Sequence, residues 1–194
     1  MSGICGWVGE ADAGVLDAML AAIDYRGDRT DQAHAPGAAL GYRWWEGRPG
    51  KSPAIHREGP HLVACAGTLA PPVPSPAAAL LARLAAGLDG LDALDGAFAC
   101  AWWDGERRRL TLLRDPFGVR SLYYVETGGV LYFATELKQL LAVPSLPVAL
   151  DAPAVHKYLT FSFVPGEDVP VRGVRRLLPG HALSWEAGRL ETRP

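Results

Sequence analysis

Apolar residues recur along the chain at two spacings, one typical of helices and one typical of strands. Between Gly14 and Tyr25 they fall three or four positions apart, which predicts an amphipathic helix that ends in a turn-rich loop over residues 26–31. From Ala97 to Trp103, large side chains alternate with alanines, which predicts a strand that is apolar on both faces. Such a strand must be covered on both sides, so the pattern favours stacked layers.

Turn residues divide the rest of the chain into short elements. Asp151 is placed to cap a helix that begins near Pro153, and the stretch from Gly173 to Arg189 resembles a final hairpin. The segment 46–60 and the prolines that precede Ala77 predict loops, and residues 91–96 predict a turn. The patterns favour an α+β fold in one domain. Further strands are predicted over residues 38–45, 62–66, 109–114, 121–125 and 130–134, and further helices over about 77–86, 136–143 and 153–161.

The overall composition fits a folded domain without a polyanionic partner. Hydrophobic residues make up 49% of the chain, which is ample for a core. The formal net charge of −2 gives no electrostatic basis for binding nucleic acid or an anionic membrane. No apolar run reaches the roughly 18 residues of a transmembrane helix, and the N-terminus lacks a signal-peptide pattern. The sequence therefore predicts a cytoplasmic protein that binds neither nucleic acid nor membranes.

The spacing of cysteine and histidine residues gives no sign of a metal centre. The three cysteines, Cys5, Cys65 and Cys100, all lie within apolar runs, so we expect buried free thiols. The five histidines show no His-x-x-x-His or similar arrangement. We therefore expect no metal site in this chain.

The first residues carry the most distinctive chemistry. Ser2 is small enough to allow removal of Met1, which would leave a hydroxyl and a free α-amine on the same N-terminal residue. In N-terminal nucleophile enzymes the first side chain attacks a carbonyl, while the α-amine, with a reference pKa of about 7.7–8.0, accepts the proton. The alternative is an ordinary flexible chain start. The run Gly3–Gly9 that follows would suit a buried strand.

Several longer motifs occur in the order found in one protein family. The run Arg114–Tyr124 reads RDPFGVRSLYY and is followed by FATELKQLL at Phe133–Leu141, with shorter matches at residues 164–166, 172–177 and 179–181. Together with the chain opening, these motifs resemble the class II glutamine amidotransferase domain of the glutamine-hydrolysing asparagine synthetases. The resemblance covers essentially the whole chain. It implies the four-layer α/β/β/α sandwich of the N-terminal nucleophile hydrolases.

The resemblance also implies what lies outside this sequence. Residues 1–194 correspond to the amidotransferase-like domain alone, and the family's ATP-dependent synthetase domain is absent, since no Ser-Gly-Gly-x-Asp loop for pyrophosphate occurs. We therefore expect no cofactor in this chain, and ATP and Mg only in a synthetase domain or partner. That asparagine-synthetase-like partner is either fused or a separate protein, and a homodimer also stays open.

Within the family's catalytic centre, two of three expected groups have changed. Ser2 stands where the family has its cysteine nucleophile, and Cys5 lies three residues too late to replace it. The oxyanion hole of the family is built by an asparagine side chain and the backbone N–H of the next glycine. Gly67 keeps that N–H, but Ala66 replaces the asparagine. Loss of one such donor costs on the order of 10²–10³ in rate.

The substrate-binding positions have changed as well. Arg26 matches the arginine that binds the substrate carboxylate in the family, and its alternative is a loop arginine paired with Asp24 or Asp28. Thr68 and Pro76 stand where the resemblance places a glutamate and an aspartate that contact the substrate. No anion is then left at these two positions for the ammonium group of glutamine.

These substitutions favour a glutaminase-inactive domain that serves as scaffold for an ATP-dependent, amide-bond-forming synthetase. The β-lactam synthetases and lasso peptide cyclases of this family have such a degenerate first domain. Two alternatives stay open: an active amidotransferase that supplies ammonia for asparagine synthesis, and a repurposed N-terminal serine amidohydrolase. The motifs themselves also have a structural interpretation, in which an Arg114–Asp115 pair and Glu136 with Lys138 hold strands and helix ends together.

Overall fold

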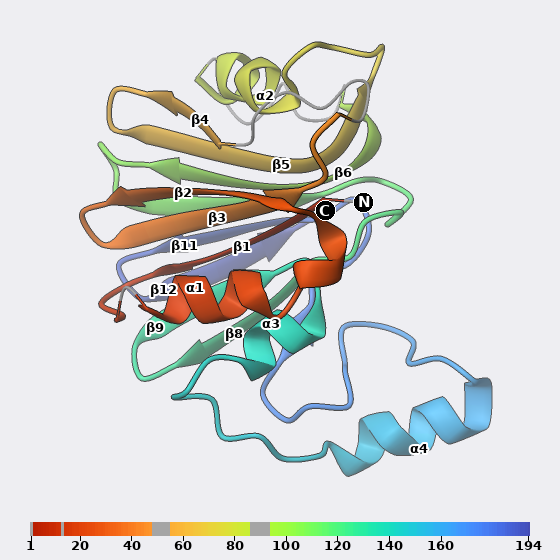
Figure 1. Cartoon of the computed structure of the whole chain (residues 1–194). Helices are drawn as coiled ribbons and strands as arrows, with labels where there is room; N and C mark the ends of the chain where they lie inside the picture. The colour runs from red at the N-terminus through yellow and green to blue at the C-terminus, as the bar shows by residue number, and fades with distance from the viewer. Residues whose placement is uncertain (1, 13, 48–54, 86–93) are drawn as a thin grey trace.

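Two antiparallel six-stranded sheets stack face to face at the centre of the protein (Figure 1). The computed structural model describes residues 2–12, 14–47, 55–85 and 94–194. The first sheet has the strand order β10-β8-β9-β1-β3-β2, and the second has the order β12-β11-β7-β6-β5-β4. In chain order the strands are β1 (Gly3–Val8), β2 (Arg29–Ala35), β3 (Ala38–Trp44), β4 (Ile55–Glu58), β5 (His61–Ala70), β6 (Asp95–Asp104), β7 (Arg109–Arg114), β8 (Tyr123–Thr127), β9 (Val130–Ala134), β10 (Arg175–Arg176), β11 (Ala182–Glu186) and β12 (Arg189–Arg193).

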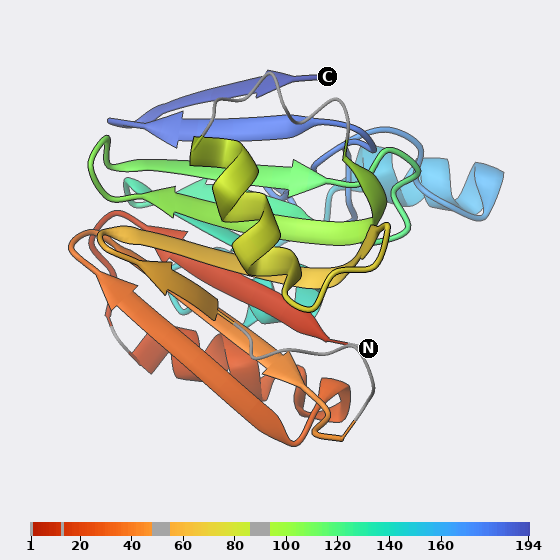
Figure 2. The ribbon, with the colours of Figure 1, turned by 90° about the horizontal axis from the view of Figure 1, so that it is seen from above.

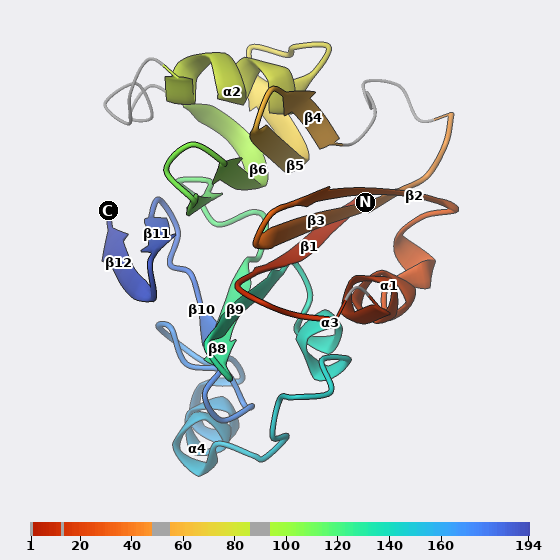
Figure 3. The ribbon, with the colours of Figure 1, turned by 90° about the vertical axis from the view of Figure 1, so that its left-hand side faces the viewer.

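Helices cover the outer face of each sheet. Helices α1 (Gly14–Ala21) and α3 (Leu137–Leu141) pack on the first sheet, where Leu16 and Leu140 share one buried cluster with Cys5. Helix α2 (Pro76–Ala85) packs on the second sheet. Figures 1 and 3 show α2 on one side of the two sheets and α1 and α3 on the other. The predicted four-layer α/β/β/α sandwich is therefore confirmed.

Strand β6 shows how the alternation of side chains builds these layers. Its alanines Ala99 and Ala101, with Trp103, lie in the core between the two sheets. Phe98, Cys100 and Trp102 point the other way and pack beneath α2. The prediction of a strand that is buried on both faces is confirmed. Small residues on the inner face let the sheets approach closely, and larger ones fill the space under the helix.

Three predicted boundaries are wrong, two of them because a strand pairs with a neighbour that the local pattern does not show. Residues 29–31, expected in a loop, begin edge strand β2, whose backbone pairs with β3. The expected loop 46–60 contains β4, which pairs with β5; residues 48–54 lie outside the described residues. Pro76, expected before the helix, is its first residue. Proline is favoured there because the first helical N–H has no partner within the helix.

Smaller differences concern the lengths of elements. The first helix ends at Ala21 and is followed by a short 3-10 turn over Asp24–Arg26. Strand β5 runs on to Ala70, four residues beyond the predicted end at Ala66. The predicted turn at 91–96 lies partly outside the described residues, and its last two residues already belong to β6. The hairpins β6–β7 and β8–β9 form as predicted, whereas the final hairpin, predicted over Gly173–Arg189, is formed by β11 and β12 at Ala182–Arg193.

The remaining helix, α4 (Ala152–Phe161), stands away from the sandwich (Figure 1). The predicted cap is confirmed, since the Asp151 carboxylate accepts a hydrogen bond from the Ala154 N–H at 2.9 Å. Within the part of the chain that the structure describes, no helix combines the length and apolar character needed to cross a bilayer.

The sandwich has two distinct ends, which Figure 2 shows on opposite sides. One end, called the Ser2 end, contains the start of the chain. Gly67 in β5 and Arg114 in β7 also lie towards this end, on either side of strand β6. At the other, called the three-turn end, the turns β2–β3, β6–β7 and β11–β12 come together. Gly37, Arg108 and Ala187 mark these three turns.

Candidate functional site

Ser2 lies directly before β1, at the Ser2 end of the sandwich. Its side chain is buried, with 3% of the residue exposed, and its Oγ has no hydrogen-bond partner among the described residues. Tyr42 on the paired strand β3 is close enough for Ser2 to affect the pKa of its phenol. Ile4, two residues further on, faces the core between the sheets, and alternation places Ser2 on the same face. The predicted removal of Met1 concerns a residue outside the described part.

Cys5 faces the opposite side of the same strand. It is fully buried in the cluster beneath α1, and this burial raises the pKa of its thiol far above the ordinary value. A thiol in that position is not an accessible nucleophile. Cys65 and Cys100 lie opposite each other in β5 and β6, and all three cysteines are free and buried, as predicted.

Arg26 forms an ion pair with a residue that is distant from it in the sequence. Its Nη2 forms an ion pair with Glu136 Oε1 at the start of α3, so the alternative of a pairing with Asp24 or Asp28 is wrong in its partner. The Arg26 guanidinium also lies 5.6 Å from the centre of the Tyr25 ring. Lys138, expected beside Glu136, places its Nζ 4.0 Å from the centre of that same ring. These contacts hold the 3-10 turn against the start of α3.

The segment Ala66-Gly67-Thr68 lies within β5, opposite Ala97–Ala99 of β6. Ala66 is fully buried in the core between the sheets, on the face that β1 and β3 cover, whereas Thr68 is exposed. Gly67 has a φ of +135°, and an added Cβ would lie 2.0 Å from the Ala97 carbonyl oxygen. Only glycine fits there. Ala66 thus lies in the layer between the sheets, which Ser2 also faces, but a methyl group offers no hydrogen bond.

Pro76 takes a different position from the other candidates. It begins α2, which covers the outer face of the second sheet, while Ser2 and Ala66 face the layer between the sheets. The Ser75 hydroxyl next to it accepts a hydrogen bond from the Ala78 N–H at 3.3 Å, which caps the helix start. The structure therefore gives Pro76 a helix-initiating role and does not bring it onto the buried face with Ser2 and Ala66.

Two further polar residues at the Ser2 end were not among the sequence candidates. Burial raises the pKa of the Tyr42 phenol, while Ser2 and the Arg120 guanidinium lower it. The Arg120 Nε is buried and has no hydrogen-bond partner in the described chain. The sequence did not single out Tyr42 because it lies in an apolar strand pattern, and it did not single out Arg120 because it lies within the motif Arg114–Tyr124. A hydroxyl, a phenol and a cation therefore gather around the buried start of β1.

The loop from Arg114 to Arg120 positions that cation. Arg114 donates to three backbone carbonyls, from Nε to Arg120 at 2.6 Å, from Nη1 to Leu177 at 2.6 Å and from Nη2 to Gly118 at 2.9 Å. The Asp115 carboxylate accepts the N–H groups of Val119 and Arg120, each at 2.9 Å. The expected pair between Arg114 and Asp115 is therefore wrong in detail: each side chain binds backbone. Their predicted structural role is confirmed.

Comparisons with known proteins assign this fold and these motifs. A family model described as a glutamine amidotransferase domain matches residues 78–194. Over 99 residues the chain is 32% identical to an asparagine synthetase [glutamine-hydrolyzing] 3 of Bacillus subtilis, a stretch that covers 50% of this chain and 16% of that protein. A putative asparagine synthetase of Mycobacterium bovis is 37% identical over 97 residues, covering 48% of this chain and 15% of the relative.

A fungal relative and a solved structure extend the comparison. The amidase chyE of Penicillium rubens is 37% identical over 97 residues, covering 50% of this chain and 14% of that protein. The matched stretches are thus a small part of these relatives' lengths. The glutamine phosphoribosylpyrophosphate amidotransferase of B. subtilis, solved with ADP and GMP, superposes with a TM-score of 0.68 at 15% identity, over 98% of this chain and 48% of that one. That likeness confirms the N-terminal nucleophile hydrolase fold.

Proposed function

The chain belongs to the glutamine amidotransferase domain family and is of asparagine synthetase type, and on this premise we propose that it does not hydrolyse glutamine. Its role in this proposal is that of a scaffold for an ATP-dependent synthetase, fused or separate, that forms an amide bond. ATP and Mg belong to that partner, and this chain itself uses no cofactor.

The observation that carries the proposal is the chemistry of the side chains around Ser2. Glutaminase chemistry by this route needs a strong nucleophile, a side-chain oxyanion donor and anions for the substrate ammonium. The corresponding positions hold the hydroxyl of Ser2, the methyl of Ala66 and the exposed Thr68. A serine alkoxide forms far less readily at neutral pH than a thiolate. Each change removes a group that the reaction uses.

The remaining cation supports the same conclusion. Arg26, which would bind the carboxylate of glutamine, already forms an ion pair with Glu136. A substrate carboxylate would have to displace that partner, and both side chains are largely shielded from water. The pair therefore favours a structural role for Arg26, in fixing the 3-10 turn to α3.

An exposed apolar segment supports the scaffold role. Residues 148–163, called the apolar arm, carry six large apolar side chains that are each 53–76% exposed. A concentration of this kind usually marks an interaction surface. These residues are Val148, Leu150, Tyr158, Leu159, Phe161 and Phe163.

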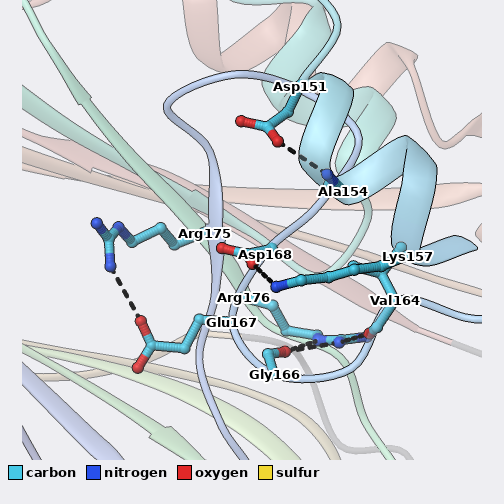
Figure 4. A network of polar contacts seen from close by, with 9 residues as sticks. All are labelled: Asp151, Ala154, Lys157, Val164, Gly166, Glu167, Asp168, Arg175 and Arg176. Carbon is cyan, nitrogen blue, oxygen red and sulfur yellow. Dashed lines mark hydrogen bonds and ion pairs between the residues drawn. The ribbon is translucent and has the colours of Figure 1, made fainter.

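Polar contacts link the apolar arm to the segment that follows it and order that segment (Figure 4). Lys157 forms an ion pair with Asp168, and Arg175 with Glu167. Arg176 Nη2 donates to the carbonyls of Val164 at 2.5 Å and Gly166 at 2.7 Å. A surface that is ordered before binding loses less entropy when a partner docks.

The occupant of the apolar arm in this proposal is the synthetase. The matched stretches are only 14–16% of the relatives' lengths, so in those proteins much further chain is available to cover such a surface. An apolar, aromatic contact area fits a permanent domain interface better than a transient polar one. This assignment rests on the proposed scaffold role.

Glutamate release is the direct test of inactivity. The protein, with its N-terminus established by intact mass, is incubated with glutamine beside the variants Ser2→Cys and Ser2→Cys/Ala66→Asn/Thr68→Glu. We expect no release above background from the wild type or from Ser2→Cys. Release by the wild type would contradict the proposal. Release by the triple variant alone would support it, because it would locate the defect in the substituted positions.

Photo-crosslinking tests the docking surface. A photoreactive residue at Leu159 is expected to trap, in cells of the source organism, a polypeptide that contains a Ser-Gly-Gly-x-Asp pyrophosphate loop. The same residue at Glu126, an exposed position on β8, serves as the matched control and should trap none. If Leu159 traps only a second copy of this chain, or only proteins without that loop, the synthetase assignment is wrong.

A second candidate function is favoured by the names of two fungal relatives, which are amidases. In that case Ser2 would act as the nucleophile of an amide hydrolase with another substrate. Such an enzyme should form an acyl adduct with an activated ester, visible as a mass increase that Ser2→Ala abolishes. The burial of Ser2 argues for the inactive scaffold, for which no adduct is expected.

A further inference from the structure

Strand β12 is the last strand of the second sheet, and no described strand pairs with its outer edge (Figure 2). A two-residue turn at 187–188, in which both residues have a positive φ, joins it to β11. In such a hairpin the flanking pair, Glu186 and Arg189, is hydrogen-bonded, and bonded and non-bonded pairs alternate from there along the strands. The backbone N–H and C=O groups of Leu190 and Thr192 therefore point away from β11.

The other three edge strands make backbone contacts within the chain. On one side of the sandwich, β2 and β4 are linked to each other: Arg57 Nη2 donates to the Gln32 carbonyl at 2.7 Å, and the Ile55 N–H donates to Asp31 Oδ2 at 3.2 Å. Strand β10 pairs with β8 on one side and with residues 167–168 on the other. Among the described residues, β12 is thus the edge strand without such cover.

The side chains of β12 alternate in direction, and the outward ones alternate in charge. Leu190 packs against the core between the sheets. Arg189 and Glu191 lie on the opposite face, where their side chains are 83% and 73% exposed. Edge strands that avoid pairing carry proline, a bulge or a charge that points inwards. None of these occurs within β12, and its alternating charges make the strand complementary to a second, reversed copy of itself.

We propose that β12 pairs with β12 of a second copy of this chain, antiparallel about a two-fold axis at Leu190. In this register the N–H and C=O groups of Leu190 bond to those of its counterpart, and Arg189 of each copy lies opposite Glu191 of the other. A register centred on Glu191 would set two carboxylates against each other. A register centred on Thr192 would place Leu190 opposite Pro194, which has no N–H to donate. The dimer does not depend on the proposed scaffold function.

Sedimentation velocity and hydrogen exchange test the pairing of the backbones. Between about 1 and 200 µM we expect a reversible dimer with a dissociation constant on the order of 10 µM, because a pair of short strands buries less area than a standard interface. The Leu190 amide should exchange more slowly at the higher concentration, whereas the Glu191 amide, bonded to β11, should not change. Thr192→Pro removes an outward N–H, leaves the hydrogen bonds of the hairpin intact and should be monomeric.

Charge reversal tests the register. Arg189→Glu and Glu191→Arg each place like charges opposite each other at both contacts, so each should weaken the dimer about tenfold or more. An equimolar mixture of the two variants should recover the dimer, because one copy then supplies two carboxylates and the other two guanidinium groups. Glu126→Arg, at an exposed position on β8, is the matched control and should leave the dimer unchanged. Circular dichroism melting curves establish that each variant is folded.

The proposal is wrong if the wild type is still monomeric at about 200 µM. It is also wrong if Thr192→Pro dimerises as tightly as the wild type, or if the mixture of the two charge variants does not dimerise. Leu159→Ser, on the apolar arm, should leave the dimer unchanged. Loss of the dimer in that variant would place the contact between copies on the apolar arm and would exclude pairing through β12.

Discussion

The loop at Arg114 and the surroundings of Ser2 lie at the same end of the sandwich. They differ in how many of their buried polar atoms have hydrogen-bond partners. All three guanidinium nitrogens of Arg114 donate to backbone carbonyls, and both carboxylate oxygens of Asp115 accept backbone N–H groups. By contrast, the Oγ of Ser2 and the Nε of Arg120 are buried without a partner in the described residues. The Nε of Arg26 is also unpaired, although its Nη2 forms the ion pair with Glu136.

This difference separates the residues that hold the fold from those that would perform chemistry. The family model matches residues 78–194, whereas the candidate site positions lie between Ser2 and Pro76. The matched range therefore includes the Arg114 loop and none of the site positions named from the sequence. A chain can keep the sandwich through the loop while the site positions lose their reactive groups.

Removing Arg114 should have the largest effect of the changes considered. Arg114→Ala leaves the carbonyls of Gly118, Arg120 and Leu177 without their donor in a buried loop. We expect the free energy of unfolding to fall by about 3 kcal/mol. Urea unfolding followed by circular dichroism measures this change. Arg193→Ala, an exposed arginine, should alter it by less than about 0.5 kcal/mol.

A small effect of Arg114→Ala would abolish the proposed distinction. If the free energy of unfolding of the variant is within about 0.5 kcal/mol of the wild-type value, water replaces the hydrogen bonds of the side chain without cost. The hydrogen bonds of the loop would then contribute no more to stability than the unpaired groups near Ser2.

Thr135 is expected to matter next, because it anchors the first strand beside Ser2. Its Oγ1 accepts a hydrogen bond from the Ile4 N–H at 3.1 Å and donates to one of two nearby oxygens, Ile4 O at 3.2 Å or Gln139 Oε1 at 3.3 Å. Thr135→Val preserves shape but removes the acceptor of the Ile4 N–H, whereas Ile4 O keeps the Thr135 N–H and Gln139 Oε1 keeps the Glu136 N–H. We therefore expect a loss of about 1–2 kcal/mol from this one buried donor. Thr160→Val, on exposed α4, is the matched control. Equal effects of the two variants would show that the start of β1 is not held by this hydroxyl.

The layers of the fold were predictable because they depend on local patterns. The alternation in Ala97–Trp103 and the helical spacing after Gly14 each reflect which face of an element is buried. Strands β2 and β4 were missed because they lie at sheet edges and are held by backbone pairing, which leaves little apolar signal in the sequence.

The site was less predictable, because its partners are distant in sequence. Ser2, Ala66 and Gly67 could be identified from motif positions, but the pairing of Arg26 with Glu136 spans 110 residues. Nothing near Arg26 distinguishes that partner from Asp24 or Asp28. Tyr42 was hidden because its ring fits an apolar strand pattern, whereas Ser2 and Arg120, which lower the pKa of its phenol, are distant from it in sequence.

A double-mutant cycle at Arg26 and Glu136 should give a medium effect and sharpen the comparison. The ion pair is partly buried, so we expect a coupling energy of about 1 kcal/mol between Arg26→Gln and Glu136→Gln in urea unfolding. The exposed pair Arg189 and Glu191 provides a control cycle with a coupling below about 0.5 kcal/mol. A coupling near zero at Arg26 would mean that its guanidinium is free to bind a substrate carboxylate.

The smallest effect is expected at Tyr42, and it appears only at alkaline pH. Burial raises the pKa of its phenol above the ordinary value of about 10, so the unfolded chain loses that proton first as the pH rises. The contribution of Tyr42 is therefore complete below about pH 10 and declines as the pH approaches the raised value. Tyr42→Phe removes this decline. Near pH 8 it should change the free energy of unfolding by less than about 0.5 kcal/mol.

Urea unfolding of the wild type and Tyr42→Phe between pH 8 and pH 10.5 measures the difference in slope. We expect the variant to lose less stability over this interval, by up to about 1 kcal/mol per pH unit at the steepest point. Tyr158→Phe, on the exposed face of α4, serves as control for the substitution itself. If wild type and Tyr42→Phe show the same slope, water reaches the phenol in the folded protein. The Ser2 end would then be a hydrated pocket, open to a substrate, and the proposed inactivity would rest on the substituted side chains alone.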